Sequence, residues 1–174
     1  MQWFAVNTRS RYEDYVAKQV GGRGYEVFLP IYKTRRKWSD RVKEIDLPLF
    51  PGYVFCRFDP VYRLPIVTTA GVIKVVGSGK TPIPVDEREI AAIQIALKTD
   101  LPREPWPFAQ IGQKVRVQHG PLSGVEGTLL NVKGSRRLVL SVTLLQRSVA
   151  LEIESALVMP LSQSPRSCTT SRLS

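Results

Sequence analysis

The first hundred residues alternate between short apolar runs and amphipathic stretches. The runs at residues 3–6, 25–29 and 72–76 have the length and composition of β-strands. Apolar side chains recur at helical spacing in residues 11–21, and again after Asp86, a residue type that caps helix N-termini. The order of these elements predicts an α+β domain in which helices pack on an antiparallel sheet.

The most apolar part of this domain follows a Pro-Gly turn. Residues 49–58 read LFPGYVFCRF, which predicts a turn at Pro51 that leads directly into a strand. Alternation along that strand places Tyr53 and Phe55 on one face and three further apolar residues on the other. Both faces are then apolar, so the domain covers the strand on both sides or offers one face to a partner.

A charged segment at residues 32–47 has β-branched flanks and predicts a long hairpin with an exposed tip. A solvated charged hairpin is the common explanation of such a pattern, and contact with phosphate groups is the alternative. The basic residues of the segment, with the tryptophan between them, are Lys33, Arg35, Arg36, Lys37, Trp38, Arg41 and Lys43.

The pattern changes after a proline-rich stretch at residues 99–108, which predicts a stiff, extended connector. Beyond it, short β-rich segments separated by glycine turns predict a small β-barrel. The expected strands are residues 114–118, 125–132, 138–144 and 148–153. The expected organisation is a domain over residues 1–99, a linker over 100–108, a barrel over 109–161 and an unstructured tail over 162–174.

The net charge of +10 and the isoelectric point near 9.9 favour an anionic partner, most often nucleic acid. No run reaches the ~18 apolar residues that span a bilayer, and the first residues lack the features of a signal peptide. We therefore expect a cytoplasmic protein. Cys56 lies in an apolar strand and Cys168 in the polar tail, and neither is assigned a redox or metal role.

The sequence contains no catalytic pattern. His119 is the only histidine, and no group of His, Cys or carboxylate residues has metal-ligand spacing. Phosphate-cradling and nucleophile-elbow motifs are also missing. The sequence therefore predicts a binding protein that is not an enzyme and has no catalytic residues, cofactor or metal.

Residues 115–130, VRVQHGPLSGVEGTLL, resemble the KOW motif at its glycines, which implies a small SH3-like β-barrel. Glycines at these positions permit a positive φ or a close backbone approach where two strands meet. The motif positions are Gly120, Pro121, Gly124 and Gly127.

Residues 3–97 resemble the N-terminal domain of the NusG family of transcription elongation factors. The resemblance rests on the opening aromatic strand, on FPGYVF followed by Asp59-Pro60, on Gly71-Val72 and on Pro84-Val85. It implies a domain that binds the clamp helices of RNA polymerase, bridges the cleft around DNA and reduces pausing. It also implies a barrel that recruits a second partner, and a hairpin directed toward upstream or non-template DNA.

Carried over position by position, the resemblance implies a hydrophobic pocket that faces the polymerase. The two aromatic residues of the first strand either line this pocket or support it. These positions are Trp3, Phe4, Phe50, Pro51, Tyr53 and Phe55. The chain departs from general NusG in the loops of the barrel, where Leu122 and Val125 replace phenylalanines and Leu144-Leu145 replaces an aromatic-Gly pair. The resemblance implies Rho or a ribosomal protein as the partner of the barrel, and these departures count against a direct transfer of either.

The overall pattern is most similar to the UpxY-like and RfaH-like paralogues, which antiterminate long operons. The housekeeping NusG function is one alternative, and a ribosome-associated RNA-binding KOW protein is another. The chain is expected to act as a monomer. The β-branched residues and glycines of residues 115–153 favour a barrel over a helical hairpin. The stiff linker predicts two separated domains, with Tyr53 and Phe55 free for polymerase.

Overall fold

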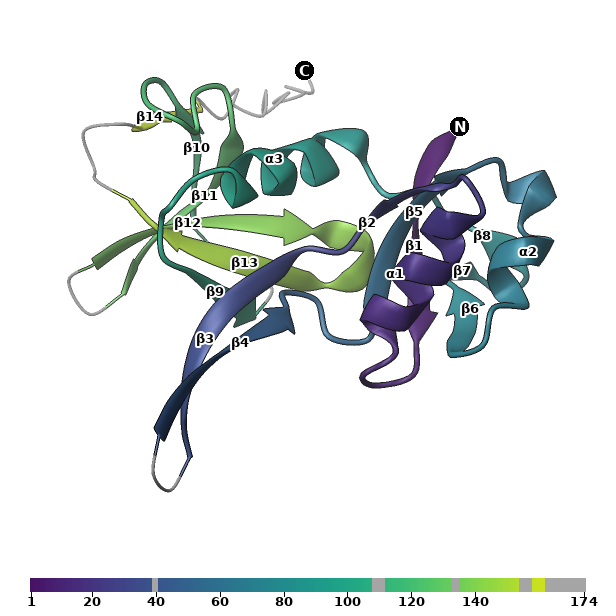
Figure 1. Cartoon of the computed structure of the whole chain (residues 1–174). Coiled ribbons are helices and arrows are strands. Elements are labelled where there is room, and N and C mark those ends of the chain that lie inside the picture. The colour runs from purple at the N-terminus through teal and green to yellow at the C-terminus, as the bar shows by residue number, and fades with distance from the viewer. Residues whose placement is uncertain (39–40, 108–111, 133–134, 154–157, 162–174) are drawn as a thin grey trace, which may run out of the picture.

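The computed structural model describes residues 1–38, 41–107, 112–132, 135–153 and 158–161. Figure 1 shows an N-terminal half of helices and strands beside a second half built of strands, with helix α3 between them. The tail predicted at residues 162–174 and the end of the linker at Phe108 lie outside the described residues. The division of the chain at residues 99 and 108 stays a prediction.

The centre of the N-terminal half is a four-stranded antiparallel sheet with the order β2-β5-β1-β6. Its strands are β1 (Gln2–Thr8), β2 (Glu26–Phe28), β5 (Tyr53–Phe58) and β6 (Val72–Val75). Together with the helices described below, this sheet confirms the predicted α+β class.

Helices α1 (Glu13–Gly22) and α2 (Leu64–Val67) cover one face of this sheet. Val16 and Val20 of α1 pack on the alternate residues of β5 that the sequence had assigned to one face, which include Cys56. Phe4 belongs to this cluster, and its ring centroid lies 4.7 Å from that of Phe58. Phe4 is paired with Cys56 and therefore lies on the opposite face of the sheet from Phe55. It does not line the face that carries Phe55, and a supporting role for it stays a prediction.

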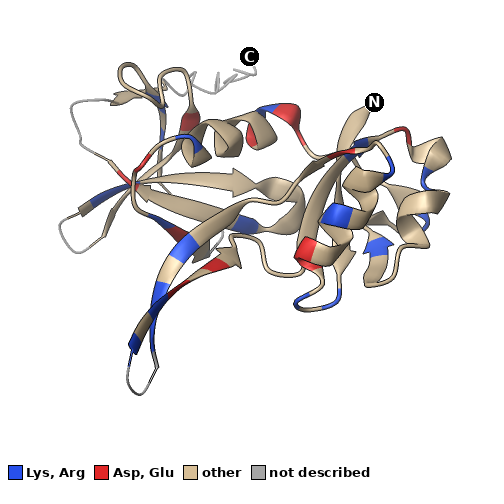
Figure 2. Cartoon of the chain, viewed as in Figure 1, with Lys and Arg blue, Asp and Glu red and all other residues tan. Residues whose placement is uncertain are grey.

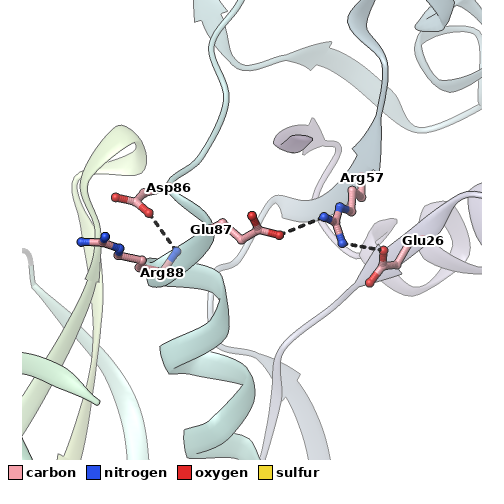
Figure 3. Close-up of polar contacts among 5 residues, drawn as sticks. All are labelled: Glu26, Arg57, Asp86, Glu87 and Arg88. Carbon is pink, nitrogen blue, oxygen red and sulfur yellow. Dashed lines mark hydrogen bonds and ion pairs between the residues drawn. The ribbon is translucent and has the colours of Figure 1, made fainter. Parts of the chain in front are cut away.

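Helix α3 (Glu87–Leu97) lies against the opposite face of the sheet. Asp86 caps it, with Oδ1 accepting a hydrogen bond from the backbone N–H of Arg88 at 2.8 Å. Arg57 of β5 reaches both Glu87 of α3 at 2.9 Å and Glu26 of β2 at 3.5 Å (Figure 3). This exposed bridge contributes little stability, but it fixes the start of α3 relative to the sheet.

A two-stranded hairpin of β3 (Ile31–Trp38) and β4 (Arg41–Pro48) projects away from both halves, as predicted (Figure 1). Residues 60–67 form a 3-10 turn at Pro60–Tyr62 followed by α2. Pro65 has no N–H to donate to the carbonyl of Val61, so one continuous helix would lack that hydrogen bond, which explains why the two stay separate. A small hairpin of β7 (Gly77–Ser78) and β8 (Thr81–Pro82) was not predicted.

The second half is a six-stranded antiparallel sheet with the order β14-β10-β11-β12-β13-β9. Its main strands are β10 (Gln113–Val117), β11 (Glu126–Val132), β12 (Ser135–Val142) and β13 (Arg147–Glu152). These strands confirm the prediction of a β domain in place of a helical hairpin. The short strand β14 (Val158–Pro160) pairs with β10 and was not predicted.

The linker contains a strand, β9 (Arg103–Pro107), which pairs with β13. The predicted connector is therefore extended at these residues, but it is part of a sheet and not a free linker. Proline removes a ladder donor only where its nitrogen would point at a neighbouring strand, and an edge strand has one side without a neighbour. Within the described part of the chain, no helix is both long and apolar enough to cross a membrane.

Burial raises the pKa of the Cys56 thiol to about 12, because a thiolate would be desolvated between the sheet and α1. On the order of 1 in 10,000 of these thiols is then ionised at pH 8. In a Cys168→Ser chain we expect Cys56 to resist a thiol-specific disulfide reagent until guanidinium unfolds the protein. Reaction of the native chain at the rate of a free cysteine would contradict the buried placement.

Candidate partner-binding sites

The sheet face opposite α1 carries a cluster of aromatic side chains, which we call the apolar sheet face: Trp3, Phe28, Phe50, Tyr53 and Phe55. The rings of Phe50 and Phe55 meet edge to face with centroids 5.6 Å apart, and Phe28 lies 6.1 Å from Phe55. Trp3 lies 6.4 Å from Phe28. The sequence did not predict Phe28 as part of this site, although the short apolar strand that contains it was recognised.

The Pro51-Gly52 turn holds Phe50 and Tyr53 in place at one end of this face. Gly52 has φ +82°, a left-handed conformation that favours glycine. Its carbonyl accepts hydrogen bonds from the backbone of Thr8 at 2.9 Å and from the side chain of Asn7 at 3.0 Å. Its N–H donates to the buried carboxylate of Glu13 at 2.8 Å. The turn is thus tied to β1 and to α1, while Pro51 itself is exposed.

The apolar sheet face is covered in this structure. Phe50 and Phe55 have no exposed surface, Trp3 is 4% exposed, and Tyr53 is half-buried. These residues belong to one hydrophobic cluster that continues through α3 into β12 and β13. The prediction that Tyr53 and Phe55 are free for a partner is therefore wrong. The barrel packs on the N-terminal half and, together with α3, covers the apolar sheet face.

The turn between β12 and β13 lies beside the N-terminal half (Figure 1) and makes polar contacts with it. The hydroxyl of Thr143 donates to Glu89 of α3 at 2.6 Å, and its backbone N–H lies 3.2 Å from the same carboxylate. Arg147 lies over the ring of Tyr53, 5.4 Å from its centroid. Glu89 has the spacing from Asp86 of a capping box, but its carboxylate binds Thr143 of the barrel. We call Thr143–Leu145 and Arg147 the barrel tip.

The KOW glycines have the backbone geometry that the sequence required. Gly120 and Gly124 have φ +85° and +84° in the connection from β10 to β11. Gly127 has an ordinary φ, but a Cβ there would lie 2.9 Å from the carbonyl oxygen of Val139 and 2.8 Å from Leu138. Pro121 follows Gly120 in the turn and is exposed. The motif therefore closes one corner of the barrel, and β11 and β12 approach closely at Gly127.

Strand register separates the basic hairpin into two different faces. Arg36 lies directly opposite Lys43, and Arg41 falls on the same face two residues from Lys43. On the other face Lys33 is opposite Asp46 and Arg35 opposite Glu44, so those charges are largely balanced, with Lys37 nearer the tip. The hairpin carries blue and red segments along its length in Figure 2.

The Arg36–Lys43 pair is unfavourable by itself, since like charges directly opposite destabilise a hairpin. Both side chains are exposed, as are those of Lys33, Arg35, Lys37 and Arg41. Trp38 pairs with Arg41 at the end of the ladder. The structure thus brings three cations, Arg36, Arg41 and Lys43, to one face of a projecting element.

The fold agrees with the comparisons with known proteins. The family profile described as "Transcription termination factor nusG" matches residues 1–94, and the chain belongs to the NusG family. A protein named "Transcription termination/antitermination protein NusG" from Helicobacter pylori (strain J99) is 28% identical over 168 residues, covering 88% of this chain and 94% of its own length. The protein of that name from Thermus thermophilus is 26% identical and covers 91% and 98%.

A solved structure described as "Domain interaction in Thermotoga maritima NusG" has a TM-score of 0.54 at 23% identity, covering 92% of this chain and 97% of that one. This likeness shows the fold. The relatives carry names of transcription termination and antitermination proteins, which places this chain among regulators of transcription and not in a known class of enzyme.

The contact between barrel tip and N-terminal half generates a prediction about opening. Leu144 and Leu145 are half-buried against the shared hydrophobic cluster, so Leu144→Asp with Leu145→Asp would place charges in an apolar contact without altering the strands. We expect the fraction of molecules in which the barrel tip has left the N-terminal half, which we call the open state, to increase roughly tenfold or more. Nuclear spin relaxation would then show the two halves tumbling separately, whereas the unchanged chain tumbles as one body.

The matched control is Val61→Asp, because Val61 is 79% exposed on the 3-10 turn of the N-terminal half. It should leave the tumbling of the chain unchanged. If the double variant also tumbles as one body, the barrel tip does not hold the halves together.

Proposed function

We propose that this chain is a transcription elongation and antitermination factor that binds the clamp helices of RNA polymerase through the apolar sheet face. The observation that carries the proposal is the character of this face. Five aromatic side chains are gathered beside a rigid turn, and part of their cover comes from a separate sheet at the end of a linker. Clustered aromatics in a preorganised setting are the usual anchors of protein interfaces.

The polymerase and the barrel then compete for one surface. Phe50 and Phe55 have no exposed surface while the barrel tip is in place, so binding requires an open state. The apparent affinity of the chain is lowered by the fraction of molecules that are closed. The weak polar contacts of Thr143 and Arg147 suit an equilibrium of this kind, since neither is a buried ion pair.

The hairpin is proposed to contact the phosphates of upstream or non-template DNA. Its face of Arg36, Arg41 and Lys43 has no acidic residue opposite, and the repulsion between Arg36 and Lys43 is relieved when an anion binds between them. Such contacts give affinity without reading sequence.

The barrel is proposed to recruit a second protein, with a ribosomal protein and Rho as the candidates that the family suggests. Leu122 and Val125, which replace the phenylalanines of general NusG, are each 3% exposed and belong to the core of the chain. A partner of the barrel therefore meets other residues.

Tyr53 provides the test of the polymerase surface. In the Leu144→Asp, Leu145→Asp background we expect polymerase binding at least ~10-fold tighter than that of the unchanged chain, because the face is already free. Adding Tyr53→Ala should weaken this binding at least ~10-fold, as removal of a central aromatic anchor does. Titration of core RNA polymerase with labelled protein measures both effects.

The control is Tyr15→Ala, which removes an exposed tyrosine from α1 on the opposite side of the sheet. It should leave the affinity unchanged. Equal affinity of the Tyr53 variant and its parent would show that polymerase does not use this face, and retention on ribosomal RNA in place of polymerase would favour the ribosome-associated alternative.

The register of the hairpin allows a matched test of DNA binding. Replacing Arg36, Arg41 and Lys43 with glutamine should lower the slope of log affinity against log salt on an elongation scaffold by about 0.9 for each phosphate that the variant no longer binds. Replacing Lys33, Arg35 and Lys37 removes the same number of charges from the other face and should change the slope less. Equal slopes for both variants and the unchanged chain would show that the hairpin is a solvated charged surface that does not contact DNA phosphates.

A further inference from the structure

The linker strand β9 fills an edge of the second sheet. It is the outermost strand and pairs with β13 from Arg103 opposite Leu151 to Pro107 opposite Arg147. This strand comes from the segment between the two halves, as Figure 1 shows, and not from the sequence of the KOW barrel itself. The edge of β13 is therefore occupied by a piece of the chain that also belongs to the connection between the domains.

The side chains of β9 fit their positions closely. Arg137 of β12 reaches across β13 to form an ion pair with Glu104, and its guanidinium lies 4.8 Å from the centroid of the Trp106 ring. The residues of β13 directly opposite Glu104 and Trp106 are Ala150 and Ser148, which are small and buried. We call Arg137, Ser148 and Ala150 the β13 edge site. Its chemistry selects an acidic residue followed two positions later by an aromatic one.

The prolines of β9 disfavour the addition of a further strand outside it. Glu152 donates its backbone N–H to the carbonyl of Pro102 at 3.3 Å, which sets the phase of the ladder. Glu104 and Trp106 then occupy hydrogen-bonding positions, while Pro105 points its nitrogen outward, as does Pro107 by the same alternation. Arg103 is then the one residue of β9 whose N–H points outward, and an edge with a single outward donor is a poor template for another strand, so an incoming strand is expected to replace β9.

The residue immediately before β9 is poorly matched to β13. Pro102 falls in a hydrogen-bonding position but has no N–H to donate to the carbonyl of Glu152. A strand with any other residue there can make one backbone hydrogen bond more than the linker does. The edge is thus filled by a strand that a partner can outcompete.

The same strand also fastens the barrel to the N-terminal half. Arg103 donates to the carbonyl oxygens of Ala96 at 3.0 Å and Thr99 at 2.7 Å at the end of α3. Side-chain donors at this end of a helix satisfy carbonyls that have no partner within it. Removal of β9 from β13 therefore loosens the connection between α3 and the barrel.

We infer that the β13 edge site binds an extended segment of a partner protein with an acidic residue two positions before an aromatic residue, and that this segment displaces β9. The inference rests on the proposed role of the barrel in recruiting a protein, and it names the site and the chemistry of that partner. Once displaced, residues 98–107 can extend to about 30 Å, enough for the barrel tip to leave the apolar sheet face. Partner binding and exposure of that face are then coupled, each favouring the other.

The test uses the full chain and a labelled, end-blocked peptide of residues 101–107 in which Pro102→Ala restores the missing donor. The linker variant Glu104→Gln with Trp106→Ala weakens the tethered strand. We expect it to bind the peptide at least ~10-fold more tightly than the unchanged chain, since a tethered competitor acts at millimolar effective concentration. Adding Arg137→Ala should reduce that binding at least ~10-fold. The control is Glu44→Gln with Tyr15→Ala, which also replaces one glutamate and one aromatic residue, but on the hairpin and on α1. It should leave peptide binding unchanged.

Amide hydrogen exchange of Ser148 and Ala150, whose N–H groups point toward β9, is measured on the same samples. Faster exchange in the linker variant, restored to slow exchange by the peptide, supports displacement of β9. Saturating peptide should also make the two halves of the unchanged chain tumble separately. Equal peptide binding by the unchanged chain and the linker variant, or unchanged exchange in that variant, overturns the inference. No polymerase is present, so this result is independent of the polymerase proposal.

Discussion

The arrangement of this protein depends on one apolar sheet face that cannot be left in water. Strand β5 is apolar on both sides, so covering one side with α1 and α2 leaves Phe50, Phe55 and their neighbours on the other. A patch of several aromatic side chains is larger than a soluble monomer normally exposes. Helix α3 covers part of it, and the barrel closes the remainder. Both the closed form and the proposed binding function follow from this single requirement.

The closed form is held by contacts of different strengths. The continuous hydrophobic cluster supplies the main attraction, because it removes aromatic surface from water. The polar contacts of Thr143 and Arg147 with the N-terminal half are exposed or partly exposed and determine orientation more than stability. An interface built in this way resembles those between domains that move, since no buried charge is left unpaired by opening. It can therefore compete with an external partner of similar apolar character.

The linker contacts both halves of the molecule. A free, proline-stiffened connector would set only the distance between the domains. Here β9 is part of the second sheet and Arg103 is part of the end of α3, so the connector shares the energetics of both halves. Any event that changes the pairing of β9 changes the freedom of the barrel. This arrangement gives the chain a physical means to link what the barrel binds to what the N-terminal half exposes.

The sequence by itself determined the elements of this protein and the faces of its strands. The alternation of Tyr53 and Phe55 with Val54 and Cys56, the Gly52 turn and the hairpin were all predictable, because each depends on residues close in sequence. Tertiary structure decided what covers each face. Phe28, Glu89 and Trp106 acquire their roles from residues on other elements, and the two faces of the hairpin differ through the register of its strands. Local patterns show that a residue is apolar or charged, but only the packing of distant segments determines its partner. For this reason the cover that the barrel provides and the pairing of the linker were not foreseen.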